Sequence, residues 1–260
     1  MKIVSLRNVA LVGAVAALPA AALAQFNGIK INERVFNDFG GTTLTVTNSN
    51  SIPGTVTIDE RGFSGSGWAN RHDALVSSDG GSTAHVFSIS DSFTVSARIN
   101  LSVGSNSPRK EAGWRINSPI TGDVLFLVNS DAGEIVAFGG GAPFRIFGSN
   151  GGGNGYVPGT TILMGMTYTP AVGQSSLANP GRIEYFIDRG NGIETSGPLN
   201  WSNLEGGPVN FTVGLYAQVS PANAGDFITA QFTDIQAVPE PATLIALGAG
   251  AVALMRRRRR

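Results

Sequence analysis

The fold is decided by the stretch SFTVSARINL, which runs from Ser92 to Leu101. Every second side chain in it is apolar, and the side chains between are polar or charged. Successive side chains of a β-strand point to opposite faces of the sheet, so this period of two predicts a strand with one buried face and one solvated face. The apolar positions are Phe93, Val95, Ala97, Ile99 and Leu101.

The same alternation returns along the chain, whereas the 3.6-residue period of an amphipathic helix does not stand out in any window between the two ends. The run Val124–Val128 is apolar without alternation. Such a run is typical of a strand in the middle of a sheet that is covered on both faces. Further strands are predicted around Leu44 and Val46, Val56 and Ile58, Ile162–Tyr168, Ile183–Ile187 and Phe211–Ala217.

Turn residues separate these runs as in antiparallel hairpins. Pro53-Gly54 lies between two predicted strands, Asp131-Ala132-Gly133 lies between two more, and Asn191-Gly192 follows another. Short strands with turn signals roughly every 8–12 residues are typical of an antiparallel sandwich or barrel. The sequence therefore predicts an all-β domain.

The first 24 residues have the three parts of a secretory signal peptide. Lys2 and Arg7 supply positive charge, and Val9–Leu18 is apolar. The small residues Ala22-Leu23-Ala24 form a cleavage site before Gln25. The pattern predicts export through the Sec translocon and cleavage by signal peptidase.

The segment 238–260 has the composition of a membrane tail. Val238-Pro239-Glu240-Pro241 precedes fourteen uncharged residues, Ala242–Met255. As a helix these would extend about 21 Å, which is short against a hydrocarbon core of ~30 Å. A block of arginines beside an apolar run acts as a cytoplasmic stop, so a short, transient membrane helix is predicted. An ordinary C-terminal anchor is the alternative. The stop consists of Arg256, Arg257, Arg258, Arg259 and Arg260.

Together, Pro-Glu-Pro, apolar run and arginine cluster resemble the PEP-CTERM sorting signal of Gram-negative bacteria. The resemblance implies recognition of Val238, Pro239, Glu240 and Pro241 by an exosortase, a membrane-embedded cysteine transpeptidase that removes the helix and the arginines. It also implies transient anchoring in the inner membrane, followed by release to the cell surface or the extracellular matrix. PEP-CTERM systems accompany exopolysaccharide production, so exopolysaccharide is the implied ligand class.

The body, residues 25–237, is expected to be one domain. It holds eleven of the eighteen basic residues and seventeen of the eighteen acidic residues, so its net charge is −6. An acidic body disfavours nucleic acid and anionic membranes as partners. The chain has no cysteine, which excludes disulfides, thiol catalysis and thiolate metal sites.

The strand order from Val86 to Ala237 resembles a concanavalin A-like jelly roll, the fold of legume lectins, laminin G-like domains and laminarinase-like glucanases. The fold predicted is an all-β antiparallel two-sheet jelly-roll sandwich, with a signal peptide and a C-terminal membrane helix outside it. Residues 25–85 are expected to supply edge strands. The resemblance rests on Phe93–Leu101, the strand Glu111-Ala-Gly-Trp-Arg-Ile, Val124–Phe138, Ile183–Asp188, Val213–Ala217 and Phe227–Ile235.

The carboxylates of the body lack the spacing of a glycosidase site. The Glu-x-Asp-x-x-Glu signature of laminarinase-like enzymes is absent from the sequence. The nearest pair on one predicted strand, Glu184 and Asp188, would lie about 13 Å apart at ~3.3 Å per residue. Retaining and inverting pairs need about 5–5.5 Å and about 6.5–9.5 Å. The prediction is therefore a non-catalytic protein. The alternative is a polysaccharide hydrolase or lyase with a non-standard acid pair.

Polar residues that follow Trp68 form one candidate ligand site. Asn70-Arg71-His72-Asp73 has two interpretations: a loop held by an internal Arg–Asp pair, which is favoured, or a site where Arg71 and Asp73 bind a polar ligand that stacks on Trp68. Ser77–Thr83 resembles an Asp-box turn but is better explained as a hairpin turn. Arg109-Lys110-Glu111 is expected to form a charged strand edge.

Three further aromatic residues have side chains large enough to stack on a sugar ring. Trp114 shares a strand face with Ala112 and Ile116, so a core position is favoured. Tyr156, in a glycine-rich loop, is a candidate platform. Trp201 lies between Pro198 and Asn203 in a predicted loop, where a platform and a core position are both open. No cofactor is predicted. Calcium binding by Asp131, or by Asp188 with Asn191, is a candidate only because jelly rolls of this kind often bind calcium.

Overall fold

The computed structural model describes residues 26–119, 122–148, 155–173, 178–201 and 210–239. The predicted signal-cleavage residues Ala22, Ala24 and Gln25 lie outside these ranges, as do Glu240, Pro241 and the terminal arginines. Within the described residues, no helix has the length and hydrophobicity to cross a bilayer. The predicted signal peptide and membrane helix therefore stay predictions.

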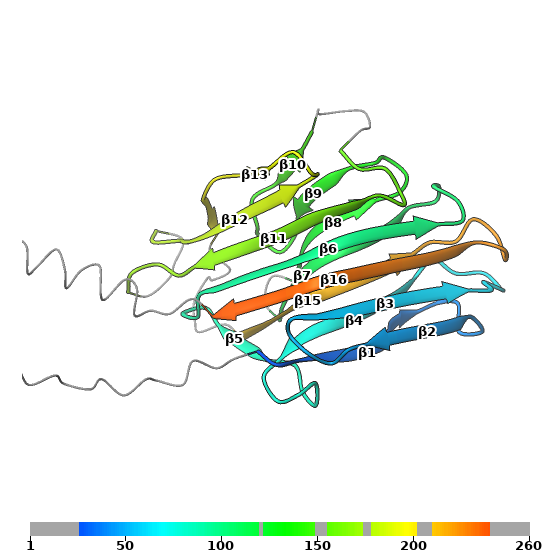
Figure 1. Cartoon of the computed structure of the whole chain (residues 1–260), viewed down its shortest axis with the longest axis horizontal. Helices are drawn as coiled ribbons and strands as arrows, with labels where there is room; N and C mark the ends of the chain where they lie inside the picture. The colour runs from blue at the N-terminus through cyan, green and yellow to red at the C-terminus, as the bar shows by residue number, and fades with distance from the viewer. Residues whose placement is uncertain (1–25, 120–121, 149–154, 174–177, 202–209, 240–260) are drawn as a thin grey trace, which may run out of the picture.

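In the part of the chain that the structure describes, sixteen β-strands form two antiparallel sheets that stack as a sandwich (Figure 1). This confirms the predicted two-sheet all-β architecture. Sheet A has the order β1 (Gly28–Asn37), β4 (Asn70–Ser77), β15 (Asn210–Val219), β7 (Lys110–Ser118), β8 (Gly122–Asn129), β9 (Ile135–Phe138) and β10 (Arg145–Phe147), and β5 (Val86–Ser88) also pairs with β15. Sheet B has the order β13 (Ile193–Thr195), β12 (Gly181–Asp188), β11 (Thr161–Thr169), β6 (Phe93–Val103), β16 (Phe227–Pro239), β3 (Gly54–Arg61) and β2 (Thr43–Asn48), and β14 (Leu199–Trp201) also pairs with β12.

The inner faces of the two sheets meet in one large apolar core. The five apolar side chains of Phe93–Leu101 are all 0% exposed, which confirms the predicted buried face of that strand. Trp114 is also 0% exposed, as the core interpretation predicted. Its indole N–H in sheet A donates to the carbonyl of Met164 in sheet B at 3.1 Å, so the core also holds a polar link between the layers.

Strand β8 has apolar contacts on both faces, as the unbroken run Val124–Val128 predicted. Val124, Phe126 and Val128 belong to the main core. Leu127 packs with Val136 and Tyr216 in a second apolar cluster. Because side chains alternate along a strand, this second cluster lies on the outer face of sheet A.

The first strands of the chain complete both sheets. Strand β1 is the edge of sheet A and β2 is the edge of sheet B. Strands β4 and β3 lie next to them, inside the sheets. The expectation that Asn70–Asp73 is a loop was wrong, because these residues begin β4 and pair with β1 and β15.

Strands β7 and β16 differ from what the sequence led us to expect. Arg109-Lys110-Glu111 does not form an exposed edge, because β7 lies between β15 and β8. Lys110 is 0% exposed, and its ammonium group lies 2.7 Å from the carboxylate of Asp226. Strand β16 continues to Pro239, so Val238 and Pro239 are part of the last strand as well as of the predicted tail.

Candidate functional site

A groove of about 720 Å³ crosses the outer face of sheet A. Six adjacent strands each contribute one side chain to it, and the loops at one end of the sheet close it. The strand residues, in sheet order, are Phe36, Arg71, Gln218, Glu111, Leu125 and Phe138; the loop residues are Gly67, Trp68, Pro108, Arg109, Ser220 and Pro221.

Four of these residues form a straight row across the sheet. Phe36 is paired with Arg71, Arg71 with Gln218, and Gln218 with Glu111. Neighbouring strands lie about 4.8 Å apart, so the row spans about 14 Å. The floor of the groove is therefore elongated at right angles to the strands.

Trp68 forms the aromatic wall of the groove together with Phe36. The Trp68 side chain is 65% exposed, and its ring centroid lies 5.7 Å from that of Phe36. The carboxylate of Asp38 accepts hydrogen bonds from the backbone N–H groups of Trp68 and Ala69, at 2.7 and 3.1 Å. These bonds fix the loop, so Trp68 presents an aromatic surface to solvent.

Arg71 lies under this wall with one donor left free. Its Nε is 3.1 Å from Asp73 and its Nη1 is 2.9 Å from Asp123. Its Nη2 is buried and has no hydrogen-bond partner within the described residues. The structure thus contains the Arg71–Asp73 pair that was expected, on a strand and beside Trp68. Because Nη2 is closed off from solvent, a ligand in the groove reaches its N–H groups only if Arg71 or a neighbouring side chain moves.

Glu111 is the carboxyl group of the groove lining. It is 5% exposed and accepts a hydrogen bond of 3.1 Å from the Tyr216 hydroxyl. Burial raises the pKa of Glu111, although the guanidinium of Arg109, 3.6 Å away, acts in the opposite direction. Arg109 also contacts Asp131 at 3.0 Å and Glu134 at 3.3 Å.

The ion pairs around the groove carry more carboxylates than guanidinium groups. Arg115 joins the cluster by pairing with Asp73 and Asp123. The cluster then has three arginines and five acidic residues, so it is net negative when all are ionised. The acidic members are Asp73, Glu111, Asp123, Asp131 and Glu134.

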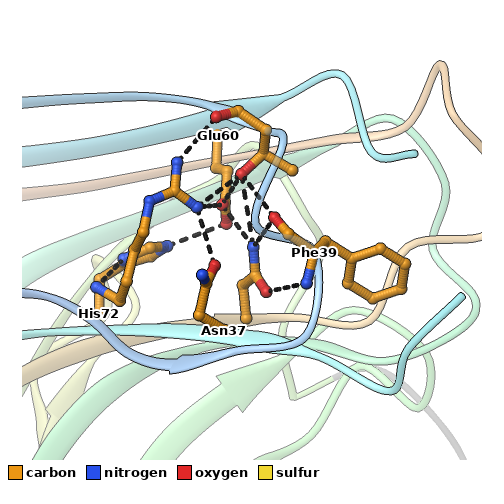
Figure 2. A network of polar contacts seen from close by, with 7 residues as sticks. Asn37, Phe39, Glu60 and His72 are labelled. Atoms are coloured by element: carbon orange, nitrogen blue, oxygen red, sulfur yellow. Dashed lines mark hydrogen bonds and ion pairs between the residues drawn. The ribbon is translucent and has the colours of Figure 1, made fainter. Parts of the chain in front are cut away.

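A buried polar network links β3 of sheet B to β4 of sheet A (Figure 2). Glu60 on β3 and His72 on β4 are both 0% exposed, and His72 Nε2 lies 2.9 Å from the Glu60 carboxylate. The backbone N–H of Arg34 donates to His72 Nδ1 at 3.0 Å. Because Nδ1 accepts, the proton is on Nε2, and His72 is the neutral donor to Glu60. The Arg34 guanidinium lies 3.2 Å from Glu60.

Glu60 is held ionised by its partners. Burial disfavours the charged form, but hydrogen bonds from His72, Thr42 and Asn70 outweigh it and lower the pKa of Glu60. Arg34 precedes Phe36 by two residues, and Asn70 follows Trp68 by two. The network therefore anchors both chain segments that carry the aromatic wall.

Acid should destabilise the fold by protonating the carboxylates whose pKa folding lowers. Folding lowers the pKa of Glu60, Asp123 and Asp226, so the unfolded chain binds more protons. Their stabilisation is present above their ordinary pKa values, about 4, and is lost as the pH falls through the lower folded values. The raised pKa of Glu111 acts in the opposite direction, but Asp59 and Asp79 also have lowered pKa values, so it is one carboxyl group against five.

We therefore expect the midpoint of thermal unfolding, followed by circular dichroism, to fall slightly from about pH 7 to pH 5, because burial lowers the pKa of His85, and to fall steeply below about pH 4. A midpoint that is constant or rises down to about pH 3 would contradict this assignment of charges.

Tyr156 and Trp201 do not contribute platforms, contrary to the sequence-based hypothesis. They are 3% and 1% exposed. The Tyr156 hydroxyl accepts from the backbone N–H of Leu101 and donates to the carbonyl of Thr160, at 2.7 and 2.9 Å. Trp201 lies in β14 and packs on Tyr168, with ring centroids 5.2 Å apart. Both aromatic rings fill the core.

The remaining candidate residues have structural partners. Asp131 pairs with Arg109, and Asp188 accepts from the backbone N–H groups of Gly190 and Gly192. In the described ranges, no three His, Asp or Glu side chains come together as a metal site would require. Asp79 accepts from Ser77 and Thr83, and these bonds lower its pKa, so the segment Ser77–Thr83 is an ordered turn.

The end of the chain matches a known sorting signal. Residues 237–260 match the PEP-CTERM protein-sorting motif. The chain carries a PEP-CTERM signal. The motif implies export, processing by an exosortase and sorting to the cell surface. No curated protein matches the sequence.

The body structurally resembles concanavalin A-like jelly rolls. The alginate lyase from Klebsiella pneumoniae aligns with a TM-score of 0.53 at 12% identity, over 84% of this chain and 97% of that one. A family 7 alginate lyase in complex with substrate aligns with a TM-score of 0.53 at 9% identity, over 84% and 93%. A further lyase of polysaccharide lyase family 7 gives 0.50 at 10% identity, over 82% and 94%. At these identities the likeness shows the fold alone.

Proposed function

We propose that this PEP-CTERM protein is a non-catalytic protein of the cell surface or extracellular matrix, and that it binds a polysaccharide in the groove of sheet A. The observation that carries the proposal is Trp68, which is 65% exposed and forms the wall of an elongated groove. Trp68 and Phe36 together form an apolar patch beside the polar side chains of the groove, and apolar patches rimmed by polar residues mark binding sites.

The groove offers the two kinds of contact that a sugar ring needs. The apolar face of a sugar ring can stack on the indole of Trp68, while its hydroxyl groups face Arg71, Gln218 and Glu111. These three side chains supply donors and acceptors along the row. An extended chain of several sugars would lie along the row and contact each strand in turn.

Charge favours a neutral or sparsely charged polysaccharide. The guanidinium groups of Arg71 and Arg109 are already paired with carboxylates, and the cluster as a whole is net negative. A densely anionic chain would also meet a body whose net charge is −6. Repulsion of this kind lowers both affinity and association rate.

A polysaccharide lyase is the second candidate. The raised pKa of Glu111, its contact with the Tyr216 hydroxyl and the free N–H groups of Arg71 favour it. The structural relatives named above as alginate lyases add to this. A lyase needs one base and a group that neutralises a sugar carboxylate, whereas a hydrolase needs two carboxyl groups, and the described lining of the groove supplies Glu111 alone.

Electrophoresis through native gels that contain a dissolved polysaccharide tests the proposal. We expect a neutral polymer, at least one of a panel of glucans and galactans, to retard the protein more than alginate does. A Gln218→Ala variant should be retarded less than the wild type. Binding to alginate alone, with unsaturated sugar ends appearing in the ultraviolet spectrum, would favour the lyase instead.

A further inference from the structure

The last four residues of β16 are attached to the domain from one side. A bulge interrupts the pairing of β16 with β6 between Thr233 and Gln236, and Asp234 within it has φ 52°. Pairing with β3 ends where Ile235 faces Gly54. Beyond this point Gln236–Pro239 pairs with β6 but not with β3, and in Figure 1 the orange-red end of β16 extends past the start of β3.

These four residues also bury little apolar surface. Ala237 is 7% exposed and joins the core, but Val238 is 51% exposed and Gln236 is exposed as well. Phe232 and Ile235, just upstream, are both 0% exposed. Detaching Gln236–Pro239 would therefore remove one methyl side chain from the core and leave the large apolar residues of β16 in place.

The sorting motif begins inside this weakly held segment. Its match starts at Ala237, and Pro239, the first residue of Pro-Glu-Pro, is paired with Phe93 of β6. An enzyme that cuts a peptide bond in a chain must enclose several residues on each side of that bond. Residues that are hydrogen-bonded in a sheet become available to such an enzyme only through local opening.

We propose that Gln236–Pro239 must separate from β6 before an exosortase can process the tail. The surface that the enzyme engages is then the released end of β16, Gln236–Pro239. Because Ile228–Phe232 stay paired with both neighbouring strands and Ile235 stays paired with Gly54 of β3, the domain stays folded while its end opens. The strength of the β6–β16 contact beyond the bulge then sets the rate of processing.

A disulfide across this contact tests the proposal. Thr94 and Val238 are directly paired, and opposed residues of antiparallel strands have Cβ atoms about 4.5–5.5 Å apart, close to the geometry of a disulfide. The chain has no cysteine of its own, so the double variant Thr94→Cys, Val238→Cys can form a single bridge. The matched control is Asn100→Cys, Gln231→Cys, which bridges the same two strands before the bulge.

The full-length variants are expressed in cells that contain the exosortase, and loss of the tail is followed by mass spectrometry. We expect the oxidised double variant Thr94→Cys, Val238→Cys to lose its tail at least about tenfold more slowly than the wild type. Reduction of its disulfide should restore the wild-type rate. The oxidised Asn100/Gln231 pair should be processed at the wild-type rate. Processing of the oxidised Thr94/Val238 pair at the wild-type rate would overturn the proposal.

Discussion

Glu60→Ala is expected to lower the free energy of unfolding by about 3–5 kcal/mol. The substitution leaves His72, Asn70 and the Arg34 guanidinium without the carboxylate that they share, in a place where His72 is 0% exposed. Buried donors that lose their acceptor cannot turn to water, so the full desolvation penalty remains. Urea unfolding monitored by tryptophan fluorescence measures the change.

The matched control is Glu194→Ala. Glu194 also pairs with an arginine, Arg189, but its side chain is 43% exposed. An exposed pair of this kind contributes at most about 1 kcal/mol. A loss for Glu60→Ala as small as that for Glu194→Ala would show that the network in Figure 2 does not hold the end of the sandwich together.

Trp68→Ala is expected to weaken polysaccharide binding at least about 30-fold, the effect of losing a central aromatic contact worth about 2 kcal/mol or more. The variant removes the exposed ring but not the hydrogen bonds from the backbone to Asp38. Stability should change by less than about 0.5 kcal/mol, because the side chain is largely solvated. Calorimetric titration with an oligosaccharide measures the affinity.

Phe144→Ala is the control for this second variant. Phe144 is 66% exposed, much like Trp68, but does not line the groove. Its removal should leave the affinity unchanged. Equal losses in the two variants would mean that binding depends on general surface hydrophobicity rather than on the groove.

The strands could be predicted because the alternation of apolar residues is a direct consequence of burial on one face. The stretch Phe93–Leu101 shows this most clearly, and Val124–Val128 shows the complementary case, in which both faces are covered. The sorting signal in the tail could also be predicted, because the prolines, the apolar run and the arginines identify it by their order alone. In each case neighbouring residues carry the whole signal.

The groove could be predicted only in part, because it depends on which strands are neighbours. Trp68, Arg71 and Asp73 are close in sequence and were singled out together. Gln218 and Glu111 join Arg71 only through the register of β4, β15 and β7, which no local pattern reveals. A weak signal was present in β4, because its sequence NRHDALVS does not alternate in polarity, as expected for a strand whose outer face is also occupied.

Tyr156 and Trp201 illustrate the opposite error. Both lie near glycines or prolines, which suggested exposed loops, yet both rings turn inward and complete the core. Neighbouring turn residues describe the path of the backbone, but the direction of a large aromatic side chain is decided by the space available to it.

The most direct test of the account is to incubate the purified body with the exopolysaccharide of the producing cells and to measure retention and chain length in the same sample. The account predicts that the wild-type protein co-sediments with the polymer, that Trp68→Ala does not, and that the length distribution of the polymer is unchanged. Shortened chains, or wild-type protein that stays in the supernatant, would contradict it.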